Sequence, residues 1–214
     1  MNRLSILPIF LTLILFGCIE RADKPARIDP ARYYPLNIGD EFIYSGKIRK
    51  EVTVNSIGDL FTRAFIDSTG DLIKWEDFVK KDNNIRLKSR FAAGSGMPAI
   101  YFEPPIPYAP WTSLVGDTLL FNTVEIRSDS INSHLRAQVK YEIMTVETVT
   151  TPSGNFHNCV KMRIFYKTLD ETETGFFDGE RLIWYAKNIG IVKYITPDGE
   201  GELLQANIAG QAVP

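Results

Sequence analysis

The chain has few of the residues from which metal centres and catalytic sites are most often built. Its 214 residues include two histidines and two cysteines, whereas a zinc site takes three or four protein ligands. Neither His134 nor His157 stands in a serine-histidine-acid or cysteine-histidine spacing. A glycine-rich phosphate loop is also missing from the sequence. We therefore predict no catalytic residues, no metal site and no cofactor.

An excess of one charge is also lacking. The chain has 24 lysines and arginines against 26 aspartates and glutamates. Such a balance leaves no basic footprint for nucleic acid and no polybasic patch for anionic lipid. We expect no nucleic-acid partner.

Long apolar runs are limited to one segment near the start, Leu4 to Phe16, which follows Arg3. A membrane-spanning helix needs about 20 apolar residues, so this run is too short to span and is typical of a signal peptide. It ends in Leu15-Phe16-Gly17-Cys18, which resembles the lipobox of bacterial lipoproteins. The resemblance implies that residues 1–17 are removed and that Cys18 carries lipid. The alternative is an ordinary secretory signal with an incidental cysteine.

Lipidation at Cys18 would place the protein at a membrane of the bacterial cell envelope. Two or more acyl chains bind a bilayer stably, whereas one is marginal. In lipoproteins the residue after the cysteine influences sorting, and Ile19 is not the aspartate associated with inner-membrane retention. This favours the outer membrane, facing the periplasm. Cys159 then has no partner for an intramolecular disulfide and should be an ordinary thiol.

Residues 18–32 carry interspersed charges and two prolines, and we interpret them as a tether. Residues 33–214 should form one β-rich domain, because apolar and polar residues alternate with period two. The inward sets are Ile85, Leu87, Ser89 and Phe91; Val139, Tyr141 and Ile143; and Val160, Met162, Ile164 and Tyr166.

The alternation predicts antiparallel strands with one wet face and little helix. Turns are predicted at Pro152-Ser153-Gly154-Asn155 and at Asp198-Gly199. A sheet of this kind must bury one face, so we expect a mainly β fold: a curved antiparallel sheet in the form of a sandwich or a half-barrel.

The two halves of this domain, residues 33–98 and 110–209, share a series of short echoes. Residues 35–40 resemble 113–117, and three later pairs follow in the same order: 58–60 with 154–156, 72–75 with 182–185, and 84–87 with 188–191. The order favours two related β-meanders packed together.

Residues 92–111 join the halves and are rich in proline and aromatic residues. Prolines disfavour a central strand here, yet the segment is too apolar for a solvated loop. It could cap the core, or it could form a binding lip for a ligand or partner. The residues of this lip are Tyr101, Phe102, Ile106, Tyr108 and Trp111.

Two motifs near the end of the chain resemble a family of uncharacterised bacterial lipoproteins. These are Gly154-Asn155-Phe156 followed by Cys159-Val160-Lys161, and Trp184-Tyr185-Ala186 followed by residues 189–193. The resemblance implies a β fold and an envelope location, and it brings no catalytic residues. A more distant analogy, on fold class alone, is the curled sheet of periplasmic lipoprotein carriers.

Three functions remain open. The first is a non-enzymatic, lipid-anchored envelope protein that binds an apolar, lipid-like ligand or an envelope protein. The second is a structural or assembly module of the envelope. The third is a glycan hydrolase, in which Glu76 or Asp77 would need a second carboxylate about 5 to 9 Å away.

Overall fold

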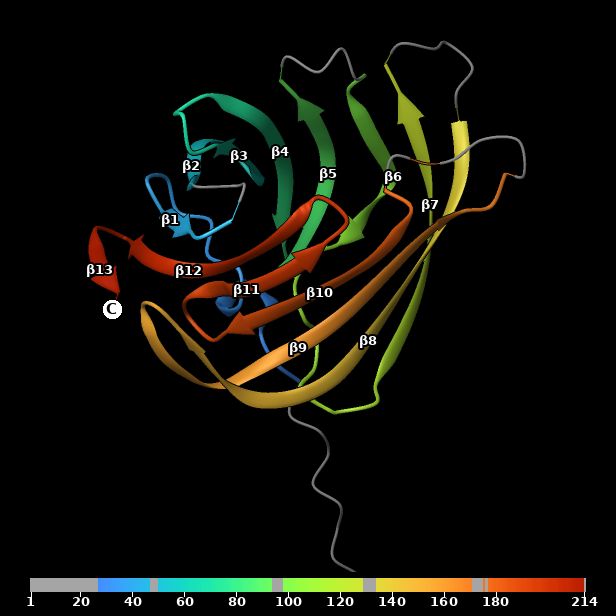
Figure 1. Ribbon diagram of the computed structural model, residues 1–214. Helices are drawn as coiled ribbons and strands as arrows, with labels where there is room; N and C mark the ends of the chain where they lie inside the picture. Colours follow the sequence, from blue (N-terminus) through green and yellow to red (C-terminus); the bar gives the residue numbers. More distant parts are fainter. Residues whose placement is uncertain are drawn as a thin grey trace, which may run out of the picture.

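The computed structural model describes residues 27–46, 50–93, 98–128, 134–170, 175 and 177–213. These residues form one short 3-10 helix, η1 (Pro30–Arg32), and thirteen strands (Figure 1). The strands are β1 (Glu41–Tyr44), β2 (Lys50–Ile57), β3 (Leu60–Ile66), β4 (Leu72–Lys81), β5 (Asn84–Ala92), β6 (Ile100–Pro107), β7 (Thr118–Arg127), β8 (His134–Thr151), β9 (Gly154–Thr168), β10 (Gly179–Ala186), β11 (Gly190–Thr196), β12 (Gly199–Ile208) and β13 (Gln211–Val213).

Each strand pairs in antiparallel fashion with the next one along the chain. The first strand also pairs with the twelfth, Phe42 opposite Ala206, and this closes the sheet into a barrel of twelve strands. Strand β13 pairs with the other side of β12 and lies outside the closed ring. The predicted mainly β, antiparallel fold is confirmed, and the curved sheet closes on itself. All strand pairing lies between residues 41 and 213, and Tyr33, Tyr34 and Leu36 of the preceding segment belong to the same core, so the described residues form one folding unit.

Alternate side chains of β8 and β9 point into the barrel, as the sequence pattern predicted. Val139, Tyr141 and Ile143 are buried, as are all four predicted inward residues of β9. The predicted turn at 152–155 joins these two strands, and Asp198-Gly199 joins β11 to β12. These hairpins are confirmed.

Two irregularities change the face that a strand presents. Opposite the bulge between Glu147 and Val149, Asn158 has a φ of 55°. Cys159 and Val160 are consequently both buried, although neighbours on a regular strand face opposite sides.

A second bulge lies at Lys88 in β5, where the pairing with β4 passes from Phe78–Leu87 to Asp77–Ser89. It exchanges the two faces of the strand. Ile85 and Leu87 point inward before the bulge, but Arg90 takes the inward place after it. Phe91 stacks instead on Trp75, with ring centroids 4.2 Å apart. Ser89, which donates to Asp77, and Phe91 are therefore not part of the inward set predicted for this strand.

The proline-rich segment contains a central strand, contrary to expectation. Strand β6 pairs with β5 at both ends of the strand and with β7 over Ile100–Glu103. Its prolines fit because residues 102–105 bulge out of the pairing with β5 opposite Lys88, and the pairing with β7 ends at Glu103, before Pro104. The bulged carbonyls still find donors: Thr123 Oγ1 donates to Pro104 O at 2.8 Å, and an Arg86 guanidinium N–H donates to Pro105 O at 3.3 Å.

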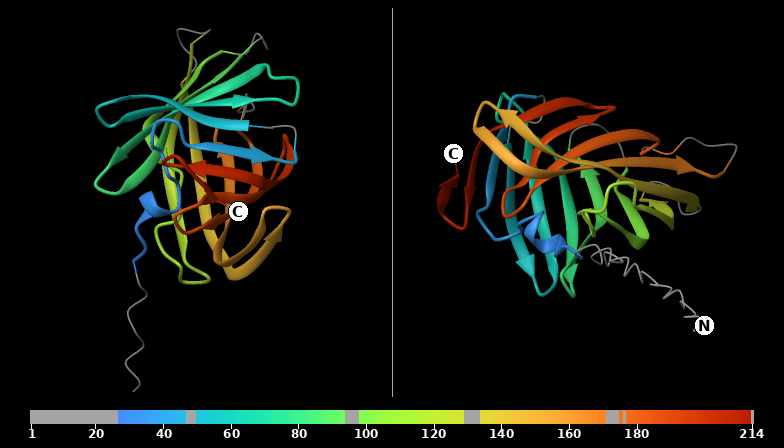
Figure 2. Two further views of the ribbon diagram at one scale, coloured as in Figure 1. Left: turned by 90° about the vertical axis from the view of Figure 1, so that its left-hand side faces the viewer. Right: turned by 90° about the horizontal axis from the view of Figure 1, so that it is seen from below.

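The segment before β1 covers one end of the barrel, where it appears in blue in Figure 2. Arg27 forms a β-bridge with Thr112, so contacts with the barrel begin within the predicted tether. Tyr34 is buried and packs on Phe78 and Tyr108, with ring centroids 5.1 and 5.0 Å away. The predicted signal peptide and Cys18 lie outside the described residues. No helix in the described ranges is long and apolar enough to cross a bilayer.

Candidate ligand site inside the barrel

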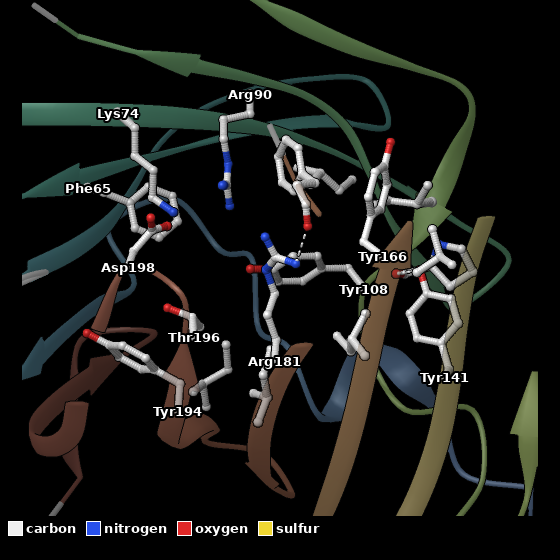
Figure 3. Close-up of a pocket in the computed structure, with 18 of the residues that line it drawn as sticks. Phe65, Lys74, Arg90, Tyr108, Tyr141, Tyr166, Arg181, Tyr194, Thr196 and Asp198 are labelled. Carbon is white, nitrogen blue, oxygen red and sulfur yellow. Dashed lines mark hydrogen bonds between the residues drawn. The ribbon is translucent and has the colours of Figure 1, made fainter. Parts of the chain in front are cut away.

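A cavity of about 70 Å³ lies inside the barrel, lined by side chains from β2 to β6 and from β8 to β11 (Figure 3). Val139 and Leu87 at its wall are fully buried, whereas Asp198 in the β11–β12 turn is exposed. The cavity therefore runs from the core toward the surface at Asp198. It has room for a few water molecules or a small chemical group.

Aromatic side chains make up much of the wall. Tyr166 and Phe177 lie 5.6 Å apart between ring centroids, and Phe102 packs behind both, at 6.2 and 5.0 Å. Tyr108 lies across the cavity from β11 and packs on Phe78 at 4.9 Å. Tilted and edge-to-face aromatic pairs of this kind add to the packing energy of the wall.

Charged groups share this interior with the aromatic rings. Lys74 Nζ lies 3.1 Å from Glu76 Oε1, and Arg90 Nε donates to the same oxygen at 2.7 Å. Glu76 is fully buried. Burial alone would raise its pKa, but Arg90 and Lys74 outweigh that effect and lower the pKa to about 2. Glu76 is therefore ionised and fixes both cations at the cavity.

A second buried ion pair joins Glu51 of β2 to Arg63 of β3, at 3.3 Å. The Arg63 guanidinium lies over the rings of Tyr34 and Phe42, 4.3 and 4.9 Å from their centroids. Burial raises the pKa of Glu51 in spite of Arg63. Glu51 also reaches the cavity wall, whereas Arg63 lies behind it.

Arg181 of β10 enters the cavity from the side opposite Arg90 (Figure 3). It donates to Phe177 O at 2.7 Å. Among the described residues it forms no ion pair with a carboxylate. Burial, and then the positive charge of Arg90, lower the pKa of Arg181, but a guanidinium still keeps its charge at any physiological pH.

The structure separates the residues of the predicted lip. Ile106 and Tyr108 line the cavity, and Phe102 is buried behind its aromatic wall. Trp111 is half-buried and packs on Tyr141, 5.9 Å between centroids. Tyr101 is 44% exposed, at a position of β6 whose side chain faces away from the buried Ile100 and Phe102. Binding at these positions stays a prediction.

Sequence reasoning missed the cations of the site. Arg181 could have been found, because it lies on the same face of its strand as the buried Ile183 and Tyr185. Arg90 could not, since its inward position depends on the bulge at Lys88.

The two carboxylates considered for hydrolysis lie on opposite faces of β4. Asp77 accepts hydrogen bonds from Thr62 and Ser89, both at 2.7 Å, away from the cavity. Glu76 has a lowered pKa, whereas a glycosidase acid needs a raised one. Within the described ranges, no three His, Cys, Asp or Glu residues are grouped as a metal site would require.

Comparisons with known proteins concern the fold. Residues 113–207 match the model of the DUF3108-like family, which corresponds to β7 through most of β12. A solved structure from Bacteroides fragilis NCTC 9343, assigned as an exported protein with a YmcC-like fold, has 17% identity and a TM-score of 0.50. The alignment covers 81% of this chain and 98% of that one.

A second solved structure, assigned as a lipoprotein from Parabacteroides distasonis ATCC 8503, has 13% identity and a TM-score of 0.44 over 81% of this chain and 97% of that one. The search among curated proteins found no match. The likeness to the Bacteroides fragilis protein shows a shared fold.

Proposed function

We propose that the protein is a lipid-anchored protein of the bacterial cell envelope whose barrel binds a small, partly apolar ligand. The observation that carries the binding proposal is the interior cavity, which the closed sheet surrounds with aromatic and aliphatic side chains. Ligand sites in proteins are concave, mostly apolar and supplied with a few polar groups. The cavity has this composition.

The size of the cavity limits the ligand. An engineered cavity of about 150 Å³ holds benzene, and this one measures about 70 Å³. It therefore fits a small group, or the end of a longer molecule that leaves through the opening at Asp198. A whole acyl chain would require the wall to move.

The envelope location is supported by the lipobox-like Leu15-Phe16-Gly17-Cys18. The assignment of the Bacteroides fragilis protein as exported agrees with it. We place the protein at the outer membrane, facing the periplasm. Detergent phase partition of the full chain, produced in a bacterium, tests the anchor: the wild type should enter the detergent phase and Cys18→Ala should not carry lipid. An unmodified Cys18 peptide in the mass spectrum of the mature wild type would contradict it.

Native mass spectrometry tests the binding. The chain from residue 19 onward keeps the whole barrel and can be purified from a periplasm without detergent. A retained small-molecule mass that disappears on denaturation supports ligand binding. A clean protein mass would overturn it, and would leave an envelope protein partner or an assembly role as the better hypothesis.

A further inference from the structure

The charges around the cavity do not balance. Two carboxylates, Glu51 and Asp198, and three cations, Lys74, Arg90 and Arg181, line it. Glu51 is paired with Arg63, and Glu76 with both Lys74 and Arg90. Asp198 is exposed in its turn; its negative charge acts on Arg181 and Arg90, but it forms no ion pair with either of them. Within the part of the chain that the structure describes, Arg181 is therefore the cation without a carboxylate of its own.

The position of Arg181 is fixed by Phe177. One guanidinium N–H donates to Phe177 O, and the Phe177 ring lies 5.3 Å from Cζ of Arg181 and 4.2 Å from Cζ of Arg90. The Phe177 ring thus contacts both guanidinium groups, which reach it from β5 and from β10. Figure 3 shows the Arg90 and Arg181 side chains pointing toward each other. An arginine has five N–H donors in a planar fork, and only one donor of Arg181 has an acceptor among the described residues.

A buried cation without an ion-paired carboxylate is costly, and an anion that pairs with it there gains strong, charge-assisted hydrogen bonds. The apolar surface beside the cations, made by Ile106, Tyr108 and Tyr166, would contact an uncharged body. Neutral aromatic walls around one free guanidinium are therefore suited to an amphiphile with one anionic group.

We propose that the barrel binds a ligand with a single anionic head and an apolar body, and that the head docks on Arg181 beside Arg90. This inference rests on the proposed ligand-binding function and names its ligand class. A carboxylate and a phosphate monoester share the required chemistry, because both present two oxygens to a guanidinium fork.

The test is calorimetric titration of the chain from residue 19 onward with three probes: hexanoate, hexyl phosphate and 1-hexanol. We expect at least one of the two anions to bind about tenfold or more tightly than hexanol. The tighter anion identifies the head group, carboxylate or phosphate. Arg181→Met should weaken that anion about tenfold or more and leave hexanol unchanged.

Arg136→Met is the matched control, because Arg136 is an exposed arginine whose ion pair with Asp170 lies on the surface. It should change neither affinity. Arg181→Lys keeps the charge but loses the fork, and it should bind the anion with intermediate affinity. If Arg181→Met does not fold, Arg181→Lys is the test. An affinity for the anion equal to that of the wild type would overturn the role of the Arg181 guanidinium group.

The outcomes separate the two proposals. If hexanol binds as tightly as the anions, the anionic head is wrong and the apolar site stands. If native mass spectrometry retains a small molecule but none of the three probes binds, the proposed ligand class is wrong. If no mass is retained and no probe binds, both proposals fail.

Discussion

Glu76 shows at the scale of one residue how the barrel tolerates charge in its core. The carboxylate is fully buried, and it remains ionised because Lys74 and Arg90 both contact Oε1. Removing one partner of such a group leaves the others buried without compensation, which costs about 3 to 5 kcal/mol.

We expect Glu76→Gln to lower the free energy of unfolding at pH 7 by roughly 3 kcal/mol. Because the pKa of Glu76 is lowered in the folded state to about 2, its contribution is present above the unfolded-state pKa and is lost as the pH falls toward 2. Urea unfolding at several pH values should show the difference between wild type and variant shrinking below about pH 5.

The half-exposed pair of Glu142 and Arg163 provides the control, with an N–O distance of 3.4 Å. Glu142→Gln should cost less than about 1 kcal/mol. A Glu76→Gln variant as stable as this control would contradict the proposed role of Glu76.

Cys159 illustrates a residue whose reactivity follows from a backbone irregularity. The bulge near Asn158 turns its thiol into the core, where Sγ donates to Phe156 O at 3.2 Å. Burial raises the pKa of the Cys159 thiol to about 11.

We expect Cys159 to resist iodoacetamide at pH 8 in the folded protein and to react once the protein is unfolded in urea, because only the thiolate is nucleophilic. Mass spectrometry of the chain from residue 19 onward measures the modification. Rapid labelling without denaturant would show that the thiol is accessible and ionised.

At the scale of strands, alternation predicted the inward residues of β8 and β9 because those strands run regularly through the segments concerned. The alternation pattern gave the wrong faces for Arg90 and Phe91, because the bulge at Lys88 depends on pairing with β4 and β6. The sequence of β5 alone does not show that pairing. The same long-range pairing explains why β6 accommodates its prolines.

The short sequence similarities between the two halves lie at pairs of strands that are six positions apart in chain order, such as β1 and β7. Asn37 O accepts from Asp40 N, and Leu114 O accepts from Asp117 N, in turns that precede β1 and β7; Gly39 and Gly116 have φ values of 86° and 88°. Both turns also bond to the following hairpin strand, through Thr53 and Ile143. The duplication stays a prediction, and these matching turns are its best support.

Two tyrosines hold the end of β6 in place. Tyr141 Oη donates to Pro107 O at 2.8 Å, and Tyr185 Oη donates to Tyr108 O at 2.7 Å. These bonds position Tyr108 at the cavity wall from strands β8 and β10.

Tyr185→Phe removes one of these donors and leaves the buried Tyr108 carbonyl without it. We expect thermal and urea unfolding to show a loss of about 1 to 3 kcal/mol. Tyr101→Phe, which changes an exposed tyrosine of the same segment, should change stability by less than about 0.5 kcal/mol. Equal effects would mean that the Tyr185 bond does not hold β6.

At the scale of the whole molecule, the barrel depends on the seam between β1 and β12. The seam extends past β1, because Ser45 N donates to Glu202 O and Glu202 N donates to Ser45 Oγ, at 2.9 and 3.0 Å. Next to it, a Cβ on Gly46 would collide with the backbone carbonyl oxygen of Glu200 and meet Tyr194 Oη at 2.9 Å.

Gly46→Ala should therefore force the seam apart and destabilise the protein by roughly 2 to 4 kcal/mol in urea unfolding. Gly116→Ala is the control, because Gly116 has open space around its Cβ position and only its positive φ opposes the change. It should cost about 1 kcal/mol. If both variants lose the same amount, the close approach at Gly46 does not limit the seam.

Alternation predicted a curved antiparallel sheet, but closure could not be read from it. Closure depends on Phe42 meeting Ala206 across the length of the chain, and no local pattern in β1 or β12 encodes that encounter. The cavity follows from closure in the same way, since its cations come from β4, β5 and β10.

The pairing of β1 with β12 also sets an order of events in time. β1 is the first strand along the chain and β12 the twelfth, so one edge of β1 has no partner until residues 199–208 reach it. An open strand edge invites pairing with another molecule, and β1, at four residues, offers a short one. Because β1 is short, its unpaired edge offers few backbone N–H and C=O groups to a strand of another molecule before β12 pairs with it.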